Sequence, residues 1–139
     1  MKIRRANQKD LDVLSNFVRE ANSTTTVHGH TLGKEYFKSV IRGGFVFVAE
    51  DQGNCKGILL ADVDARIQFS KIIHVVVHPE ENDEEIREAL VNKHMNECKK
   101  MNICDIALQT SDKEKKTLKF FENMGFSPEN KFVLMTRTI

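Results

Sequence analysis

The sequence has few of the residues that mark specialised architectures. Its 139 residues include no tryptophan, one tyrosine and two prolines. The net charge is +1, from 21 basic and 20 acidic side chains, and no stripe of clustered Lys and Arg is present. Because binding to nucleic acid depends on clustered positive charge that faces phosphates, we expect no nucleic acid among the partners.

Long apolar runs and paired cysteines are also missing. No window approaches the apolar length that crosses a bilayer, so we expect no membrane contact. The three cysteines, Cys55, Cys98 and Cys104, are odd in number and have no Cys-x-x-Cys spacing. Together with an N-terminus that lacks the apolar stretch of a signal peptide, they predict reduced thiols in a cytoplasmic protein.

The composition that remains is that of an ordinary globular protein, with 40% hydrophobic and 29% charged residues. No linker, repeat or low-complexity segment divides the chain. A chain of this length suits one domain with a sizeable core. We therefore expect a single domain over residues 1–139.

The first third of the chain reads as a strand followed by two helices. A strand is expected at residues 2–6 and a helix at residues 9–21, whose apolar residues recur at helical spacing. Those residues are Leu11, Leu14, Phe17, Val18 and Ala21. Residues 22–33 are expected to form a loop, because three consecutive threonines are poor helix formers. A shorter helix is expected at residues 34–41, and Gly43 and Gly44 stop it.

The middle of the chain changes to strand patterning. Strands are expected at residues 45–50, 55–64 and 69–78, with a turn at residues 51–54 between the first two. The third strand carries a near-continuous apolar run, which favours a central strand covered on both faces. Pro79 ends it, because proline cannot donate to a ladder.

The last part alternates helices and strands. The helix at residues 83–100 places Ile86, Leu90, His94 and Cys98 on one face, with Ala89 and Met101 alongside. A strand at residues 104–110 follows. The helix at residues 112–124 turns Leu118, Phe121 and Met124 inward, ends in Gly125 as C′ residue, and leads to a strand at residues 131–138. The order β-α-α-β-β-β-α-β-α-β predicts an α/β (α+β) fold, with a mixed, mostly antiparallel sheet flanked by helices.

Two local patterns, in this order of elements, resemble the GNAT N-acetyltransferase family over nearly the whole chain. The first is Val77-His78-Pro79-Glu80 at the end of the apolar strand, before a long amphipathic helix. The second is the segment FFENMGF at residues 120–126, which is similar to the family's F-Y-E-K-x-G-F. The resemblance implies a GNAT-like fold and the transfer of an acetyl group from acetyl-CoA to an amine of a small molecule or a peptide.

The resemblance also implies where acetyl-CoA would bind. It would lie where the strands at residues 69–78 and 104–110 splay apart, with backbone groups of Val75 and Val77 bonded to the pantetheine arm. The pyrophosphate would rest on the start of the next helix, because unsatisfied N–H groups and the helix dipole attract anions. That helix start comprises Asn82, Asp83, Glu84, Glu85, Ile86 and Arg87.

The sequence departs from the family pattern at this helix start. The family reads Q/R-x-x-G-x-G/A there, whereas this chain has no glycine in the stretch and adds carboxylates. Asn82 and Glu85 have the spacing of a capping pair, which would satisfy the helix without a ligand. Phe121 stands where the family often has a tyrosine that protonates the leaving thiolate, and Glu114 stands where it often has asparagine. Two functions therefore stay open: an acetyltransferase, and a GNAT-fold binding or regulatory protein that has lost acetyl-CoA.

Histidines and acidic residues supply the other candidates for chemistry. His74 interrupts an apolar strand beside the expected cleft, and a reference pKa of about 6.5 suits a general base; a buried, hydrogen-bonded histidine is the alternative. His94 lies on an apolar helix face and is expected in the core. Asp62 and Asp64 alternate on one strand, where they either attract a cationic amine or form a polar sheet face.

No metal is expected, and the oligomeric state stays open. His28 and His30 are two histidines without a cysteine or carboxylate partner in view, which is too few ligands for a zinc site. The chain is expected to act as a monomer or a homodimer, and the sequence does not identify the acceptor amine.

Overall fold

The structure is a computed structural model that describes residues 1–21, 26–27, 30–31, 33–78, 80–81, 83–110, 113–129 and 135–139. It divides into two compact units, Met1–Gln109 and Thr110–Ile139. Each unit is described by itself.

The first unit is built on a five-stranded sheet in the order β1-β4-β5-β6-β7. The strands are β1 (Lys2–Arg5), β4 (Gly44–Asp51), β5 (Asn54–Asp64), β6 (Phe69–Val77) and β7 (Asp105–Leu108). Neighbouring strands run antiparallel except β6 and β7, which run parallel. The predicted mixed, mostly antiparallel sheet is therefore confirmed.

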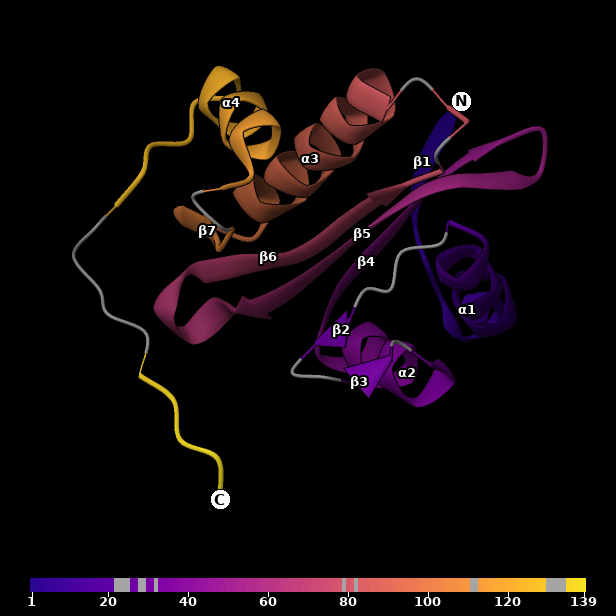
Figure 1. Cartoon of the computed structure of the whole chain (residues 1–139), viewed down its shortest axis with the longest axis horizontal. Coiled ribbons are helices and arrows are strands. Elements are labelled where there is room, and N and C mark those ends of the chain that lie inside the picture. The colour runs from indigo at the N-terminus through magenta and orange to yellow at the C-terminus, as the bar shows by residue number, and fades with distance from the viewer. Residues whose placement is uncertain are drawn as a thin grey trace. The chain divides into compact units, whose positions relative to one another are not determined.

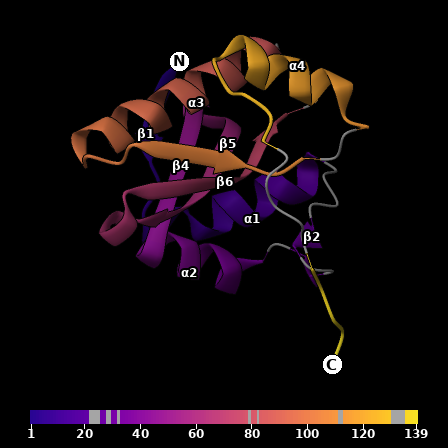
Figure 2. The same cartoon turned by 90° about the vertical axis from the view of Figure 1, so that its left-hand side faces the viewer.

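Helices cover the two faces of this sheet (Figures 1 and 2). One face packs against α1 (Leu11–Glu20) and α2 (Lys34–Gly43), and the other against α3 (Asp83–Lys100). The apolar stripe predicted for the first helix is buried, except that Leu11 is half-buried. It joins side chains of α2, β4, β5 and β6 in one core cluster: Leu14, Phe17, Val18, Ala21, Phe37, Val40, Val46, Val48, Ile58, Leu60 and Val76.

A tight hairpin connects β4 and β5. Gln52 and Gly53 have φ values of 52° and 80°, and Asp51 lies opposite Asn54. Two successive residues with positive φ form the turn that matches the twist of paired strands. The turn predicted at residues 51–54 is confirmed.

The opposite face of the sheet is covered by α3, whose buried residues include the four predicted ones, Ile86, Leu90, His94 and Cys98, and also Val91, which was not predicted. Gly57 on β5 permits their close approach. A Cβ atom there would lie 2.9 Å from Ile86 Cγ2 and 3.2 Å from Leu90 Cδ1. Met101 was expected on the same face, but it is 43% exposed because α3 ends at Lys100.

His94 is a core residue, as predicted, with 0% of its surface exposed. The Ser70 hydroxyl donates to the Asp62 carbonyl at 2.9 Å, so it accepts from His94 Nε2 at 2.9 Å. The rings of Phe45 and Phe47 meet the imidazole edge-on. This burial lowers the pKa of His94 to about 4.

The structure corrects two predictions about strands. The loop expected at residues 22–33 contains β2 (Thr26–Val27) and β3 (His30–Thr31), which pair antiparallel; Thr and Val favour strands once a partner is present. The strand β6 was expected to be covered on both faces, yet most of its residues are half-buried. Continuous runs of buried residues occur instead in β4, at residues 44–49, and in β5, at residues 57–61.

The second unit contains α4 (Lys115–Asn123) and its termination at Gly125. Gly125 has φ of 92°, its N–H donates to Glu122 O at 3.0 Å, and Phe126 N–H donates to Phe121 O at 3.0 Å. The Phe121 and Phe126 rings lie 5.3 Å apart. These bonds and this contact define a Schellman motif and confirm the predicted C′ glycine.

The strand predicted at residues 131–138 falls partly outside the described residues, which omit 130–134. Residues 135–139 form no strand in the described part of the chain, and Met135 is 87% exposed. Pro79 also lies outside the described residues.

Candidate active site

The strands β6 and β7 are paired only along the first half of β6. They pair from Phe69 opposite Asp105 to Ile72 opposite Leu108, where β7 ends. On its other side, β6 continues to pair with β5 as far as Val77 opposite Gly57. Within the described ranges, the second half of β6 therefore has no strand partner on its β7 side.

The backbone groups of Val75 and Val77 point to this unpaired edge. His78 N–H donates to Lys56 O at 3.1 Å, so the backbone of His78 faces β5. Backbone groups of successive strand residues point to opposite edges. Val77 and Val75 therefore direct their N–H and C=O groups away from β5, where each can receive or donate a hydrogen bond.

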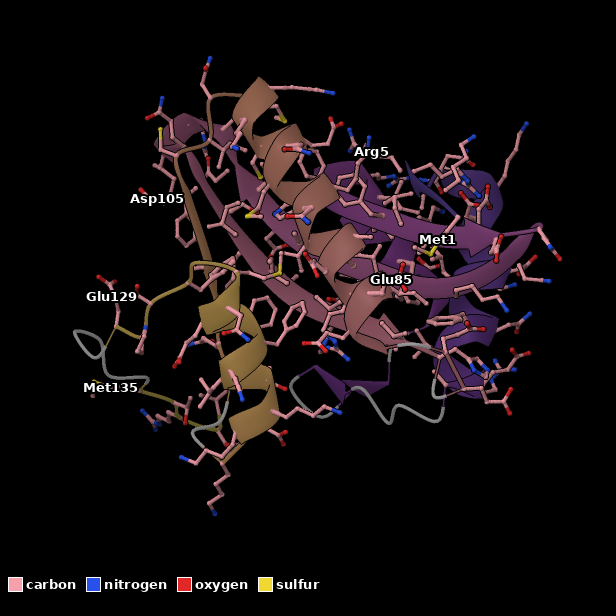
Figure 3. The ribbon with its side chains drawn as sticks, turned by 90° about the horizontal axis from the view of Figure 1, so that it is seen from above. Met1, Arg5, Glu85, Asp105, Glu129 and Met135 are labelled. Atoms are coloured by element: carbon pink, nitrogen blue, oxygen red, sulfur yellow. The ribbon has the colours of Figure 1, made fainter. Side chains whose placement is uncertain are left out.

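The first turns of α3 place a positively charged side chain, Arg87, at the same edge. Arg87 Nη1 donates to Val75 O at 3.4 Å. Glu84 and Glu85 are exposed in the first turn of α3, and Figure 3 labels Glu85 near this end of the helix. Ile86 is buried at 6% exposure, so its side chain belongs to the core. Asn82 and the side chain of Asp83 lie outside the described part of the chain.

The turn between β6 and α3 is anchored by His78 and Lys56. His78 O accepts from Glu81 N–H at 3.0 Å, and His78 Nδ1 accepts from Glu80 N–H at 3.3 Å. Lys56 Nζ pairs with Glu81 Oε1 at 2.8 Å. The start of α3 is thus held to β5 as well as to β6.

His74 lies on the face of β6 that is turned towards α1 and α2, opposite the face that α3 covers. It is opposite Leu60, and directly opposite residues of an antiparallel pair share a face. Its Nε2 atom is buried and has no hydrogen-bond partner among the described residues. Burial lowers the pKa of His74, so the ring stays neutral near neutral pH. A neutral imidazole nitrogen without a partner is able to accept a proton.

Asp62 and Tyr36 lie on the same face as His74. Asp62 is two residues along β5 from Leu60, and Tyr36 comes from α2. Burial, and then the charge of Asp62, raise the pKa of the Tyr36 hydroxyl. Sequence reasoning missed Tyr36, although it is the only tyrosine of the chain.

The described residues contain neither a cluster of side chains that could bind a metal ion nor a helix that could span a membrane. No three His, Cys, Asp or Glu side chains among them are placed to hold a metal ion. His28 and the side chain of His30 fall outside them. No helix among the described ranges is long and apolar enough to cross a membrane.

Solved structures of acetyltransferases share this fold. An aminoglycoside acetyltransferase from an uncultured soil metagenomic sample, in complex with trehalose, is 16% identical with a TM-score of 0.80, covering 99% of this chain and 95% of that chain. PaiA N-acetyltransferase from Thermoplasma acidophilum, in complex with coenzyme A, is 18% identical with a TM-score of 0.78, covering 94% and 92%. A ribosomal-protein-alanine N-acetyltransferase from Brucella melitensis is 12% identical with a TM-score of 0.77, covering 99% and 100%.

Sequence comparison identifies the family. No curated protein sequence matches the chain. The family model described as acetyltransferase (GNAT) domain, however, matches residues 3–133, which is nearly the full length. With this match and the shared fold, the chain belongs to the GNAT acetyltransferase domain family.

Proposed function

We propose that this protein transfers an acetyl group from acetyl-CoA to a primary amine of a small molecule or peptide. The observation that carries the proposal is the unpaired second half of β6, which leads directly into the start of α3. An amide-bearing ligand arm and a phosphate group need these two features side by side. The complex of the PaiA relative with coenzyme A supports the same cofactor.

The pantetheine arm would bind along the free edge of β6. Its amides can exchange hydrogen bonds with Val75 and Val77, as an added strand does at a sheet edge. The guanidinium of Arg87 lies at this edge, bonded to Val75 O. Guanidinium groups match phosphate oxygens in geometry and charge, so Arg87 is the side chain that we assign to the cofactor's phosphates.

The pyrophosphate would rest on the N–H groups at the start of α3, in the stretch from Asn82 to Arg87. The carboxylates of Glu84 and Glu85 oppose it. A carboxylate about 5 Å from a phosphate costs roughly 0.8–3 kcal/mol, for effective dielectrics between about 80 and 20. We therefore expect weaker acetyl-CoA binding than a glycine-rich loop gives, with backbone N–H groups and Arg87 supplying the affinity.

His74 is the residue that we assign as general base. Its Nε2 atom takes a proton from the acceptor amine, whose nitrogen then attacks the thioester carbonyl carbon. The C–N bond forms as the C–S bond breaks, and the sulfur leaves as a thiolate. Phe121 has no proton to give, but a thiol with a pKa of about 8.5 leaves acceptably in this form.

The proposal extends to the whole chain. We propose that residues 1–139 act as one acetyltransferase domain in the cytoplasm, as a monomer or homodimer. The match of a single family model across residues 3–133 supports one domain, because it includes both compact units.

An assay that follows the loss of thioester absorbance in a mixture of acetyl-CoA and a primary amine tests both the acetyl transfer and the role of His74 as general base. The His74→Gln variant should turn over about 10²–10⁴-fold more slowly, because general-base help is typically worth that factor. Its affinity for acetyl-CoA should be unchanged, because the pantetheine arm is assigned to backbone groups of Val75 and Val77 at the free edge of β6 and not to the face that carries His74. In the wild type, activity should fall as the pH drops through the pKa of His74, which burial places below 6.5.

Three results would contradict parts of this proposal. Full activity of His74→Gln would remove His74 as the base. An acid limb that survives in His74→Gln would assign the titration to another group. If the thioester of acetyl-CoA stays intact with every amine tried, the alternative function, a GNAT-fold binding protein without acetyl transfer, would be favoured.

A further inference from the structure

The segment between β6 and α3 carries many acidic side chains where we place the pyrophosphate. Residues 80–85 read Glu-Glu-Asn-Asp-Glu-Glu, which is five carboxylates in six positions. Glu84 and Glu85 are exposed, whereas Glu81 is half-buried. Lys56 Nζ lies 2.8 Å from Glu81 Oε1, and each of these two side chains is 29% exposed. The charge of Glu81 is therefore balanced by a cation that β5 supplies.

The ion pair holds the Glu81 carboxylate on the face of the sheet that α1 covers, opposite to α3. Lys56 and Glu81 line one cavity of about 420 Å³ together with Val13 and Phe17 of α1. The next residue of β5, Gly57, faces the other way, because a Cβ atom there would meet side chains of α3. The Glu81 carboxylate thus lies on the β5 side of β6, away from α3 and from the free edge.

Hydrogen bonds of His78 support the same arrangement. His78 N–H donates to Lys56 O at 3.1 Å, which ties the end of β6 to the residue that supplies the cation. His78 O accepts from Glu81 N–H at 3.0 Å, which ties Glu81 back to β6. Lys56 and Glu81 are therefore joined twice, directly through their side chains and indirectly through the backbone of His78.

We propose that Lys56 is a positioning residue for acetyl-CoA, because it draws the Glu81 carboxylate to the α1 face and so keeps it away from the bound pyrophosphate. Lys56 acts through Glu81 and does not itself touch the cofactor. This inference rests on the proposed acetyl transfer, and it adds a residue of a different strand to cofactor binding at the start of α3. It explains how a helix start rich in carboxylates can still accept an anion.

Without Lys56, the side chain of Glu81 would be free to turn towards the phosphates. A carboxylate about 8 Å from one phosphate charge weakens binding by about 2- to 35-fold, for effective dielectrics between about 80 and 20. The fold depends far less on the pair, since ion pairs at the surface contribute little to the free energy of unfolding. Lys56→Gln should therefore fold normally and lose affinity for acetyl-CoA.

Equilibrium titration of Lys56→Gln with acetyl-CoA tests the inference. We expect the dissociation constant to rise by about 2- to 35-fold over the wild type. Lys56→Arg keeps a cation for Glu81 and should bind acetyl-CoA like the wild type. In a Glu81→Gln background, Lys56→Gln should change the dissociation constant by less than about twofold, because no carboxylate is left to position.

Further readouts distinguish the positioning of Glu81 from a structural role of Lys56. At about 1 M salt, where charges are screened beyond about 3 Å, the dissociation constants of Lys56→Gln and the wild type should converge. The KM for acetyl-CoA should rise in Lys56→Gln while kcat at saturating acetyl-CoA stays unchanged. Arg66→Gln is the matched control, because it removes the cation of the ion pair with Asp64 at the far end of β5, and it should leave the affinity unchanged.

The outcomes separate this inference from the function on which it rests. Wild-type affinity in Lys56→Gln would overturn the inference and leave acetyl-CoA binding standing. An equal rise of the dissociation constant on Lys56→Gln in the wild type and in Glu81→Gln would also overturn it, because Lys56 would then act without Glu81. No binding of acetyl-CoA by the wild type would contradict the proposed function itself, and this inference with it.

Discussion

His94 shows how a single buried residue couples the core to pH. Its imidazole is surrounded by the Phe45 and Phe47 rings and has Ser70 as hydrogen-bond partner. Burial lowers its pKa from 6.5 to about 4. Between these values the unfolded chain binds a proton that the folded chain does not. The stabilising effect of a neutral His94 is therefore complete above pH 6.5 and is lost as the pH falls towards 4.

Replacement of His94 by glutamine should flatten this pH dependence. The amide can still donate to Ser70 but does not titrate. Between pH 7 and pH 4, the unfolding free energy of the wild type should fall by about 3 kcal/mol more than that of His94→Gln. Urea denaturation at a series of pH values measures both. Parallel curves for the two proteins would mean that His94 titrates normally and is not held neutral by the core.

The sequence was sufficient to place His94 but not to place the side chains around His74. Spacing of four residues among Ile86, Leu90, His94 and Cys98 puts them on one helix face whatever the fold. The position of Asp62 relative to α2 depends instead on the register that sets Asp62 opposite Gly44 and on the packing of α2 against β4 and β5. No local pattern carries that register, so this position was not predictable.

At the scale of elements, the position of α3 decides the geometry of the candidate site. Gly57 lets Ile86 and Leu90 pack closely on β5. Arg87, the residue after Ile86, then reaches the Val75 carbonyl at the free edge of β6. The lack of a side chain at Gly57 thus helps to place the guanidinium of Arg87, which we assign to the phosphates of acetyl-CoA.

Gly57→Ala should displace the start of α3. Its Cβ would lie within 3.2 Å of Ile86, Leu90 and the Val76 carbonyl, and overpacking of this kind costs about 1–3 kcal/mol. We expect a lower unfolding free energy in urea and weaker acetyl-CoA binding. Gly43→Ala is the control, because a Cβ there meets nothing within 4 Å, and it should change stability by less than about 0.5 kcal/mol. Wild-type stability of Gly57→Ala would contradict the close packing of α3.

Elements with a strong internal pattern were predictable, and very short elements were not. The helices α1 and α3 and the β4–β5 turn follow from apolar spacing and from a Gly in a two-residue turn. The short strands β2 and β3 contain two residues each, which is too short for any periodicity. The coverage of β6 was overestimated, because its apolar run does not reveal that β7 pairs with only its first half in the described residues.

At the scale of the molecule, β6 separates two proposed functions of one site. Its free edge and the start of α3 would hold the acetyl donor. The face towards α1 and α2, with His74, would hold the acceptor amine. This division explains why the family pattern was recognisable from the order of elements and from Val77 to Glu80, whereas the face on which His74 lies required the sheet register.

Calorimetric titration with acetyl-CoA at low ionic strength tests the central claim most directly, because every proposed step needs this cofactor. We predict saturable binding at one site per chain. The binding should weaken in Arg87→Gln, whose glutamine keeps a donor for Val75 O but loses the charge. No heat of binding and no rise in melting temperature at millimolar acetyl-CoA would contradict the account, since a ligand of the folded state must stabilise it.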